Sequence, residues 1–339
     1  MKLRWEATGM TNIERIPTAG MSREAWLAER KLALGGSDMG AILGLNAYRS
    51  AVNVWADKLG LIEGTEDNEA MRIGRDLEGY VASRFSESSG LRVQAYNYLL
   101  RDHANHLSAN IDRRVLGEPA GLECKTASAL SEGKYRGGSY PESYYAQCVT
   151  YLAVTGWTRW YLCAVVLGRG VYIYMMTTIE DDTCPEWCES MVYVSPEELD
   201  AVRGVARSWW ETYVEPKVMP PTDGSASTTA TLGSLYNDGS DPDKADLSNM
   251  VPDVAAYLAL KAQARELDTQ ADAIKQALMA TMGNRSKAIC PGYSISWASQ
   301  TRTTLDRKAL EREHPEIDMT KYLKTSTSRT FRCSQKEDK

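Results

Sequence analysis

The sequence lacks any long apolar segment, and this absence limits where the protein can act. No stretch approaches the run of about 18 uninterrupted apolar residues that a membrane-spanning helix needs. The first residues also lack the short apolar core of a secretory signal. We therefore expect neither membrane insertion nor secretion.

Paired cysteine motifs are also lacking. The seven cysteines are an odd number, and they are scattered without CxxC or Cys/His spacing. This usage indicates a reduced, cytoplasmic protein without a disulfide framework or a zinc site. Cys184 and Cys188 have the wrong spacing for a redox or iron-sulfur motif.

Positive charge is not in excess over the chain as a whole. The net charge of -6 argues against a protein that coats nucleic acid through overall basicity. Residues 284–339 are the exception, because basic side chains outnumber acidic ones there. An acidic metal site with basic patches elsewhere suits an enzyme that holds phosphate locally.

The chain is long enough for a catalytic domain and an appendage, each with its own core. Patterns of apolar residues predict an α/β domain over residues 1–215. The expected elements are helices near 68–88 and 142–155 and strands near 91–99, 107–116, 120–126, 158–167 and 170–179. Residues 216–250 are rich in Pro, Gly, Ser, Thr and Asp, which is typical of a linker. Residues 251–339 are expected to form a small helix-and-hairpin appendage.

The expected C-terminal helix carries an apolar seam with alternating steps of three and four residues. Its members are Tyr257, Leu260, Ala264, Leu267, Ala271, Ile274 and Leu278. Such a seam needs a packing partner. Either the hairpin expected over 287–300 or another helix could provide it.

Two carboxylates and an ammonium group are predicted to converge on one hairpin. Strand alternation places Glu123 and Lys125 on the same face, and a short turn at 117–119 brings Asp112 alongside. Such a trio can hold a hard divalent cation and place a lysine beside the water that attacks a phosphodiester. An exposed polar edge strand would show the same alternation, so the hairpin alone leaves both interpretations open.

A helix-loop-helix corner precedes this hairpin. Ser22 can cap a helix that ends near Lys31, and Ser37 can cap the next helical turn. Arg30 and Ser37 then flank the corner. Arg30 could be an ordinary helix-end cation, or it could bind phosphate together with the helix N-terminus near Ser37.

Several short motifs follow one another in a characteristic order. They are Gly35-Gly36-Ser37-Asp38, Gly74-Arg75-Asp76-Leu77-Glu78, Asn110-Ile111-Asp112, Glu123-Cys124-Lys125 and Tyr144-x-x-Gln147. As an ordered set over roughly residues 22–215, they resemble the lambda exonuclease and YqaJ-type viral recombinase family of PD-(D/E)xK nucleases. The resemblance implies a restriction-endonuclease-like α/β core with a central mixed sheet flanked by helices.

The resemblance also implies roles for the residues of these motifs. Asp112 and Glu123 would bind Mg²⁺, with Mn²⁺ able to substitute, and Glu78 would support a second metal position. Lys125 would orient or activate the attacking water, and Gln147 would align that water or the lysine. All five residues are thus expected to be catalytic, and the three carboxylates are the expected metal ligands.

Recognition of a DNA end is implied for the helix-loop-helix corner. Arg30 and Ser37 match positions that grip the 5′-phosphate in this family. Where relatives can carry a serine two residues before the metal-binding aspartate, this chain has Asn110, whose amide can also donate to phosphate. We therefore expect these three residues to bind the 5′-phosphate.

By this resemblance the protein is a Mg²⁺-dependent 5′–3′ exonuclease of a phage or prophage recombination pair. It would degrade linear double-stranded DNA to mononucleotides, act as a homotrimeric ring, and leave 3′ overhangs for a single-strand annealing protein. An endonuclease or structure-specific nuclease could use the same hydrolytic residues. A non-catalytic nucleic-acid-binding module and an interaction protein dominated by its C-terminal helix are the alternatives outside enzymes.

Overall fold

The computed structural model describes residues 13–63, 68–237, 239, 243–324 and 329–335. The chain divides into two compact units, Met1–Tyr236 and Asn237–Lys339. In this described part of the chain, no helix combines the length and the apolar character needed to cross a membrane.

The first unit contains helices and strands in alternation. Its helices are α1 (Arg23–Lys31), α2 (Gly36–Ile42), α3 (Ala51–Lys58), α4 (Glu69–Ser89), α5 (Glu142–Thr155), α6 (Pro196–Trp209) and α7 (Ala226–Leu235), with shorter turns η1 (Ala129–Lys134) and η2 (Trp210–Val214). Its strands are β1 (Ile13–Pro17), β2 (Leu34–Gly35), β3 (Val93–Ala95), β4 (Tyr98–Asp102), β5 (Leu107–Asn110), β6 (Arg113–Val115), β7 (Ala120–Ala127), β8 (Arg159–Val166), β9 (Gly170–Thr177) and β10 (Ser190–Tyr193).

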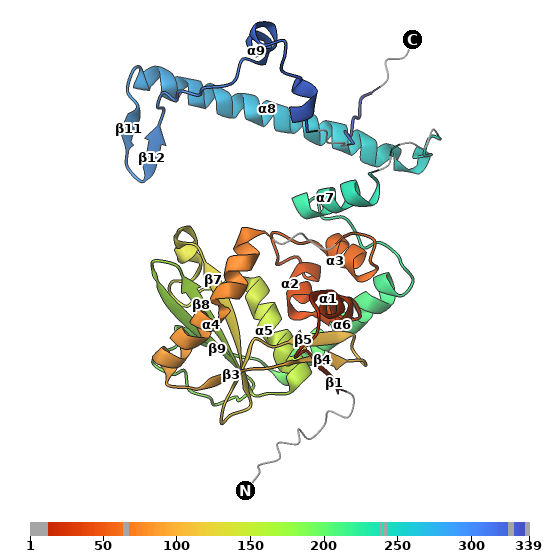
Figure 1. The fold of residues 1–339 in the computed structure, drawn as a ribbon, viewed down its shortest axis with the longest axis vertical. Helices are drawn as coiled ribbons and strands as arrows, with labels where there is room; N and C mark the ends of the chain where they lie inside the picture. The colour runs from red at the N-terminus through yellow and green to blue at the C-terminus, as the bar shows by residue number, and fades with distance from the viewer. Residues whose placement is uncertain (1–12, 64–67, 238, 240–242, 325–328, 336–339) are drawn as a thin grey trace. The chain divides into compact units, whose positions relative to one another are not determined.

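These strands form two sheets. A six-stranded sheet has the order β10-β9-β8-β7-β6-β3, with parallel pairs β7/β8 and β9/β10 and antiparallel pairs elsewhere. A four-stranded sheet has the order β1-β4-β5-β2. Helices α4 and α5 lie on opposite sides of the six-stranded sheet (Figure 1). The expected α/β fold with a central mixed sheet flanked by helices is confirmed.

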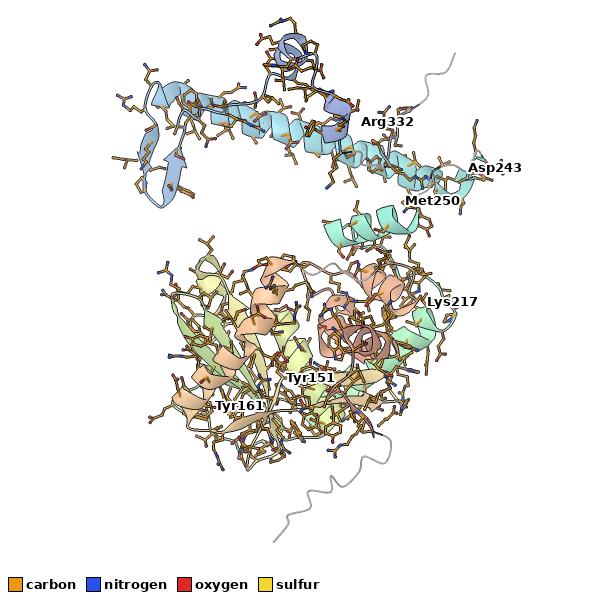
Figure 2. The ribbon with its side chains drawn as sticks, in the orientation of Figure 1. Tyr151, Tyr161, Lys217, Asp243, Met250 and Arg332 are labelled. Carbon is orange, nitrogen blue, oxygen red and sulfur yellow. The ribbon has the colours of Figure 1, made fainter. Side chains whose placement is uncertain are left out.

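The two faces of strand β8 pack against different helices, as alternation along a strand requires. Tyr161 contacts Phe85 of α4, with ring centroids 5.3 Å apart. Its neighbour Trp160 contacts Tyr151 of α5 on the other face, with centroids 5.0 Å apart. Figure 2 labels Tyr151 and Tyr161 within this unit. Gly121 on β7 leaves room for the Trp160 ring, because a Cβ atom there would lie 2.4 Å from it.

The single strand expected over 107–116 is wrong in one respect, because the chain leaves one sheet and enters the other at Ile111 and Asp112. Strand β5 belongs to the four-stranded sheet and β6 to the six-stranded sheet. At the break, the Asp112 carboxylate accepts the main-chain N–H of Cys124 at 2.9 Å, in place of a ladder hydrogen bond. The register of β6 with β7 pairs Arg113 with Leu122, so its continuation places Asp112 opposite Glu123.

The stretch expected to be a linker contains helix α7, which packs on α3. Ser50 donates its main-chain N–H to Ser227 at 3.0 Å, and the Asn53 amide donates to the Thr231 hydroxyl at 3.0 Å. Thr231 is buried against α3 although its side chain is polar. The composition of this stretch therefore did not predict the helix. The first compact unit extends past Glu215 to Tyr236.

The second unit contains the expected long helix and hairpin. Its elements are η3 (Ser248–Met250), α8 (Val251–Met282), β11 (Lys287–Cys290), β12 (Tyr293–Ser296), α9 (Arg307–Glu313) and η4 (Met319–Tyr322). Strands β11 and β12 pair antiparallel, as the sequence predicts. Helix α9 is an addition to the expected elements. It begins at an Asp306 cap, whose side chain accepts the N–H of Ala309 at 3.0 Å.

Candidate active site

Strand β7 directs Glu123 and Lys125 toward helix α5, where they meet Gln147. Glu123 is only 3% exposed. Its Oε1 atom accepts hydrogen bonds from Lys125 Nζ at 2.6 Å and from Gln147 Nε2 at 2.7 Å. Lys125 Nζ also donates to Gln147 Oε1 at 3.0 Å. The three side chains thus form a closed triangle of hydrogen bonds on one face of the sheet.

The second carboxylate oxygen of Glu123 has no partner. Its Oε2 atom is buried and receives no hydrogen bond from any residue in the part of the chain that the structure describes. A buried, unsatisfied carboxylate oxygen is costly, and a folded protein rarely keeps one without a reason. This atom is therefore a strong candidate ligand for a cation.

Asp112 lies opposite Glu123 in the register of β6 with β7, in an electrostatically unfavourable place. Burial and the charges of Glu123 and Glu78 raise its pKa well above the usual range, although Lys125 and the N–H of Cys124 partly oppose the shift. Carboxylates that repel one another in a buried cluster are stabilised by a shared cation. The negative charges of Glu123 and Glu78, the other two expected metal ligands, therefore both act on Asp112.

Glu78 pairs with a cationic side chain in this structure. It forms an ion pair with Arg113, whose guanidinium also donates to the main-chain oxygen of Asp112 at 2.7 Å. Among the described residues, no three His, Cys, Asp or Glu side chains are grouped closely enough to enclose a metal ion. Glu78 would have to exchange Arg113 for a metal position before all three carboxylates could act together.

The donor set at this site fits a hard divalent cation. Asp112 and Glu123 supply carboxylate oxygens, which are the ligands preferred by Mg²⁺ and Mn²⁺. The unsatisfied Oε2 atom of Glu123 supplies the position that a ligand needs. The thiol of Cys124 points to the opposite face from Glu123, as alternation along β7 requires, so it adds no soft ligand.

Lys125 is held as a cation. Burial lowers its pKa, but the charges of Glu123 and Asp112 and the hydrogen bond to Glu123 outweigh burial and raise the pKa above the usual value. The Tyr144 ring lies beneath the ammonium group, with Nζ 4.7 Å from the ring centroid. The structure thus favours the charged form of a lysine whose protonation state the sequence leaves open.

Helix α2 approaches Gln147 closely through a glycine. A Cβ atom on Gly36 would lie 2.8 Å from Gln147 Cγ and 3.0 Å from the Tyr151 ring. Gln147 Nε2 in turn donates to the Tyr151 hydroxyl at 2.9 Å. Tyr151 therefore helps to orient Gln147, a role that its place in an aromatic helix face did not reveal. The Gly-Gly pair in the sequence was the available signal for this close approach.

The expected phosphate-binding residues also come together. Arg30 donates to the Ser37 hydroxyl at 3.4 Å. Arg30 also lies 4.7 Å from the Trp26 ring centroid, and the Trp26 indole donates to Asn110 at 3.3 Å. Trp26 thus connects Arg30 with Asn110. Sequence reasoning missed this residue, although its spacing of four from Arg30 places both on one helix face.

The corner that carries Ser37 is capped differently from the expectation. Gly35 is the N-cap of α2, and Ser37 lies inside the first turn rather than at the cap. The Asp38 side chain accepts the Gly35 N–H at 2.8 Å. A side chain three residues into the helix therefore fixes the corner, which explains why a search for a cap serine misplaced the start.

A buried ion cluster supports this corner. Lys58 Nζ lies 2.6 Å from Asp38 Oδ2 and donates to the main-chain oxygen of Arg30 at 2.7 Å. Arg49 pairs with the other Asp38 oxygen and with Asp57. Burial favours a raised Asp38 pKa, but the charges of Lys58, Arg49 and Arg30 hold that pKa well below its usual range. The cluster thus ties α1, α2 and α3 together behind Arg30.

Comparison with known proteins places this chain in a family. Residues 25–158 match the model of the YqaJ-like viral recombinase domain. The protein YqaJ of Bacillus subtilis (strain 168), whose function is uncharacterized, is 30% identical over 317 residues, which cover 92% of this chain and 93% of that protein. The chain belongs to the YqaJ-like viral recombinase family. This membership supports a nuclease role.

The solved structures to which this chain is similar include two exonucleases. The alkaline exonuclease LHK-Exo from Laribacter hongkongensis is 16% identical, and the match covers 57% of this chain and 94% of that chain with a TM-score of 0.44. A phage-related exonuclease from Haemophilus somnus 129PT is 11% identical, and the match covers 55% of this chain and 96% of that chain with a TM-score of 0.40.

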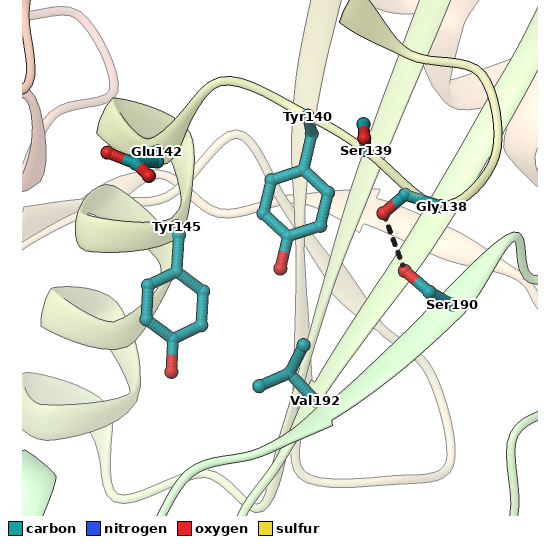
Figure 3. Close-up of a pocket in the computed structure, with 7 residues that line it drawn as sticks. All are labelled: Gly138, Ser139, Tyr140, Glu142, Tyr145, Ser190 and Val192. Carbon is teal, nitrogen blue, oxygen red and sulfur yellow. Dashed lines mark hydrogen bonds between the residues drawn. The ribbon is translucent and has the colours of Figure 1, made fainter.

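A separate hollow lies at the other side of α5 in this YqaJ-like protein. Tyr140, Glu142, Tyr145 and Val192 contribute to its lining (Figure 3). The Tyr145 hydroxyl donates to Glu198 at 2.7 Å, so the two elements α5 and α6 are joined beside the hollow. None of the expected catalytic or phosphate-binding residues lines it.

Replacing Lys58 with methionine should show how strongly the buried ion cluster holds this corner. Lys58→Met leaves the buried Asp38 carboxylate without one of its two ion-pair partners, so we expect the free energy of unfolding at neutral pH to fall by about 3–5 kcal/mol. Urea unfolding measures the loss, with the exposed Lys134→Met as a matched control.

The loss of unfolding free energy in Lys58→Met should also depend on pH, and it should become smaller as the pH falls. The depressed Asp38 pKa contributes stability above the unfolded-state pKa, and this contribution is lost only as pH falls through the folded-state pKa. In Lys58→Met that pKa rises, and a protonated Asp38 needs no cation. The stability difference from wild type should therefore narrow between about pH 7 and pH 4. A difference that stays constant over this range would contradict the assignment.

Proposed function

We propose that this protein is a Mg²⁺-dependent exonuclease that degrades linear double-stranded DNA from its 5′ ends. Its products would be mononucleotides and a duplex with 3′ single-stranded overhangs. The observation that carries the proposal is the buried triangle of Glu123, Lys125 and Gln147 beside Asp112, with one Glu123 oxygen left unsatisfied. A purely structural polar cluster would satisfy that oxygen within the protein.

Each residue of the site would have its own role in phosphodiester hydrolysis. Asp112 and Glu123 would hold Mg²⁺, with Glu78 joining after release from Arg113. When bound, Mg²⁺ stabilises the charge that develops on the phosphate and favours ionisation of the attacking water. Lys125 stays charged, so it would orient the water and stabilise negative charge rather than accept a proton. Gln147 fixes Lys125 through its side-chain oxygen.

Selection of a 5′ end would come from Arg30, Ser37 and Asn110. The guanidinium of Arg30 offers a planar pair of donors that suits phosphate oxygens. Helix α2 connects this pocket to the hydrolytic residues, because Gly36 lies against Gln147 and the next residue, Ser37, accepts a hydrogen bond from Arg30. A terminal phosphate bound by Arg30 would therefore lie near the scissile position.

The assembly and the partner follow from the family resemblance. We propose a homotrimeric ring that encircles duplex DNA, because a closed ring keeps the enzyme on its substrate between cleavages. The 3′ overhang would pass to a single-strand annealing protein of a phage or prophage. The three subunits would carry identical sites, so each subunit could act on a DNA end.

Removal of a hydrolytic residue should abolish turnover while DNA binding persists. Asp112→Asn and Lys125→Ala should each lower the rate on linear duplex by about three orders of magnitude or more, because stabilisation of the transition state would be lost. Release of nucleotides from an end-labelled duplex measures the rate. The exposed Lys134→Ala serves as the control for lysine removal. Near-normal activity of either site variant would exclude the assigned roles.

The choice of metal should separate binding from catalysis. Mg²⁺ and Mn²⁺ should support digestion, whereas Ca²⁺ should support DNA binding with little cleavage, because its larger and looser ligand shell misplaces the water. Chelation should stop digestion and leave the fold intact. Digestion at the full rate in excess chelator would show that the oxygen-rich site is not a metal site.

Arg30→Ala should erase the preference for a 5′-phosphate while leaving basal hydrolysis. The experiment compares initial rates on duplexes that differ only in a 5′-phosphate or a 5′-hydroxyl, for wild type, Arg30→Ala and Arg23→Ala. Arg23 lies on the same helix and controls for loss of one positive charge. Wild type and Arg23→Ala should prefer the phosphorylated end. The same preference in all three proteins would remove Arg30 from end recognition.

A further inference from the structure

Helix α8 carries an apolar seam that stays largely exposed among the described residues of its own unit. The helix has 32 residues, which correspond to about 48 Å. Along the seam, Leu260 and Leu267 are each 63% exposed and Ile274 is 66% exposed. Tyr257 contacts Phe331 at one end of the seam, with ring centroids 5.7 Å apart, but it is still 40% exposed. Neither the hairpin nor a second helix of the described residues provides the partner that the sequence predicts.

The seam has the geometry of a coiled-coil interface. Its steps of three and four residues are uninterrupted from Tyr257 to Leu278, which is the spacing of first and fourth heptad positions. A long helix gains most of its stability by packing such a face. We propose that α8 pairs with α8 of a second copy of this chain, and that the two helices run antiparallel.

The pattern of large and small residues favours the antiparallel arrangement. With the two helices fully overlapped, Leu260 would face Ala271 of the second copy, and Ala264 would face Leu267 of the second copy. Tyr257 would face Ile274 at each end. Each of these three pairs then combines one larger side chain with one smaller one. A parallel pair would instead stack Ala264 on itself and Ala271 on itself, which leaves voids in two layers.

The charges that flank the seam point to the same arrangement. Lys261 and Asp268 occupy the same heptad position, on one side of the seam. In the antiparallel overlap, Lys261 of each copy comes beside Asp268 of the other, so the two-fold symmetry makes two ion pairs. In a parallel pair the flanking residues opposite Lys261 and Asp268 would be Ala256 and Gln263, which carry no charge. No ion pair engages Lys261 or Asp268 within the residues that the structure describes.

A two-fold pair of this kind is compatible with any assembly of the first unit. An isologous contact joins copies in twos, because both copies use the same surface. The inference goes beyond the proposed nuclease function and does not depend on it. The two can fail separately, because the first is measured as molecular mass and the second as DNA cleavage.

The test measures the molar mass of the full chain by sedimentation velocity for wild type and two sets of variants. Ile274→Glu places a charge in the seam, and Gln276→Glu places the same charge on the outer face of the helix as a control. Ile274→Glu should halve the number of copies in the assembly, whereas Gln276→Glu should match wild type. An unchanged mass in Ile274→Glu would overturn the proposal.

Charge reversal tests the direction of the pair. Lys261→Glu and Asp268→Lys should each weaken self-association by at least about tenfold, because each puts like charges together twice. The double variant should restore wild-type association. Both residues are exposed, so the helix should remain folded, and circular dichroism checks this. Failure of the double variant to restore association would exclude the antiparallel register. A wild type that does not associate through α8 would show that the seam belongs to another protein.

Discussion

The site depends on one physical constraint, which is the burial of the Glu123 carboxylate. One oxygen is satisfied twice, by Lys125 and Gln147, and the other oxygen has no partner among the described residues. A buried anion of this kind fixes its surroundings. It keeps Lys125 charged and contributes to the raised pKa of Asp112. The unpaired oxygen makes the buried carboxylate unfavourable by itself, and a bound cation would remove that cost.

The two functional regions are mechanically connected through helix α2. Gly36 rests directly on Gln147, whereas Ser37, the next residue, contacts Arg30. The Asp38 carboxylate behind them fixes the start of the helix and is held by Lys58. A single short helix therefore contacts Gln147 on one side and Arg30, of the proposed phosphate pocket, on the other. Two adjacent residues, Gly36 and Ser37, thus contact the two regions that we propose for hydrolysis and for end recognition.

Much of the site could be predicted from sequence because its geometry follows from strand alternation. Glu123 and Lys125 share a face wherever β7 forms, and a short turn brings Asp112 to them. The break at Ile111 was not predictable, because the passage from one sheet to another depends on tertiary packing. Lys58 was missed for a related reason: its partner Asp38 lies in another helix, and an isolated lysine at a helix end usually faces solvent. Helix α7 was missed because small polar residues bury without an apolar period.

The central claim is that Asp112 and Glu123 form a divalent cation site, and Mn²⁺ binding tests it most directly. Electron paramagnetic resonance reports free Mn²⁺, so titration of the full chain without DNA measures uptake independently of cleavage. Wild type should take up Mn²⁺, and both Asp112→Asn and Glu123→Gln should lose this uptake. Glu142→Gln, at the exposed start of α5, should bind as wild type does. Equal Mn²⁺ uptake by all four proteins would contradict the account.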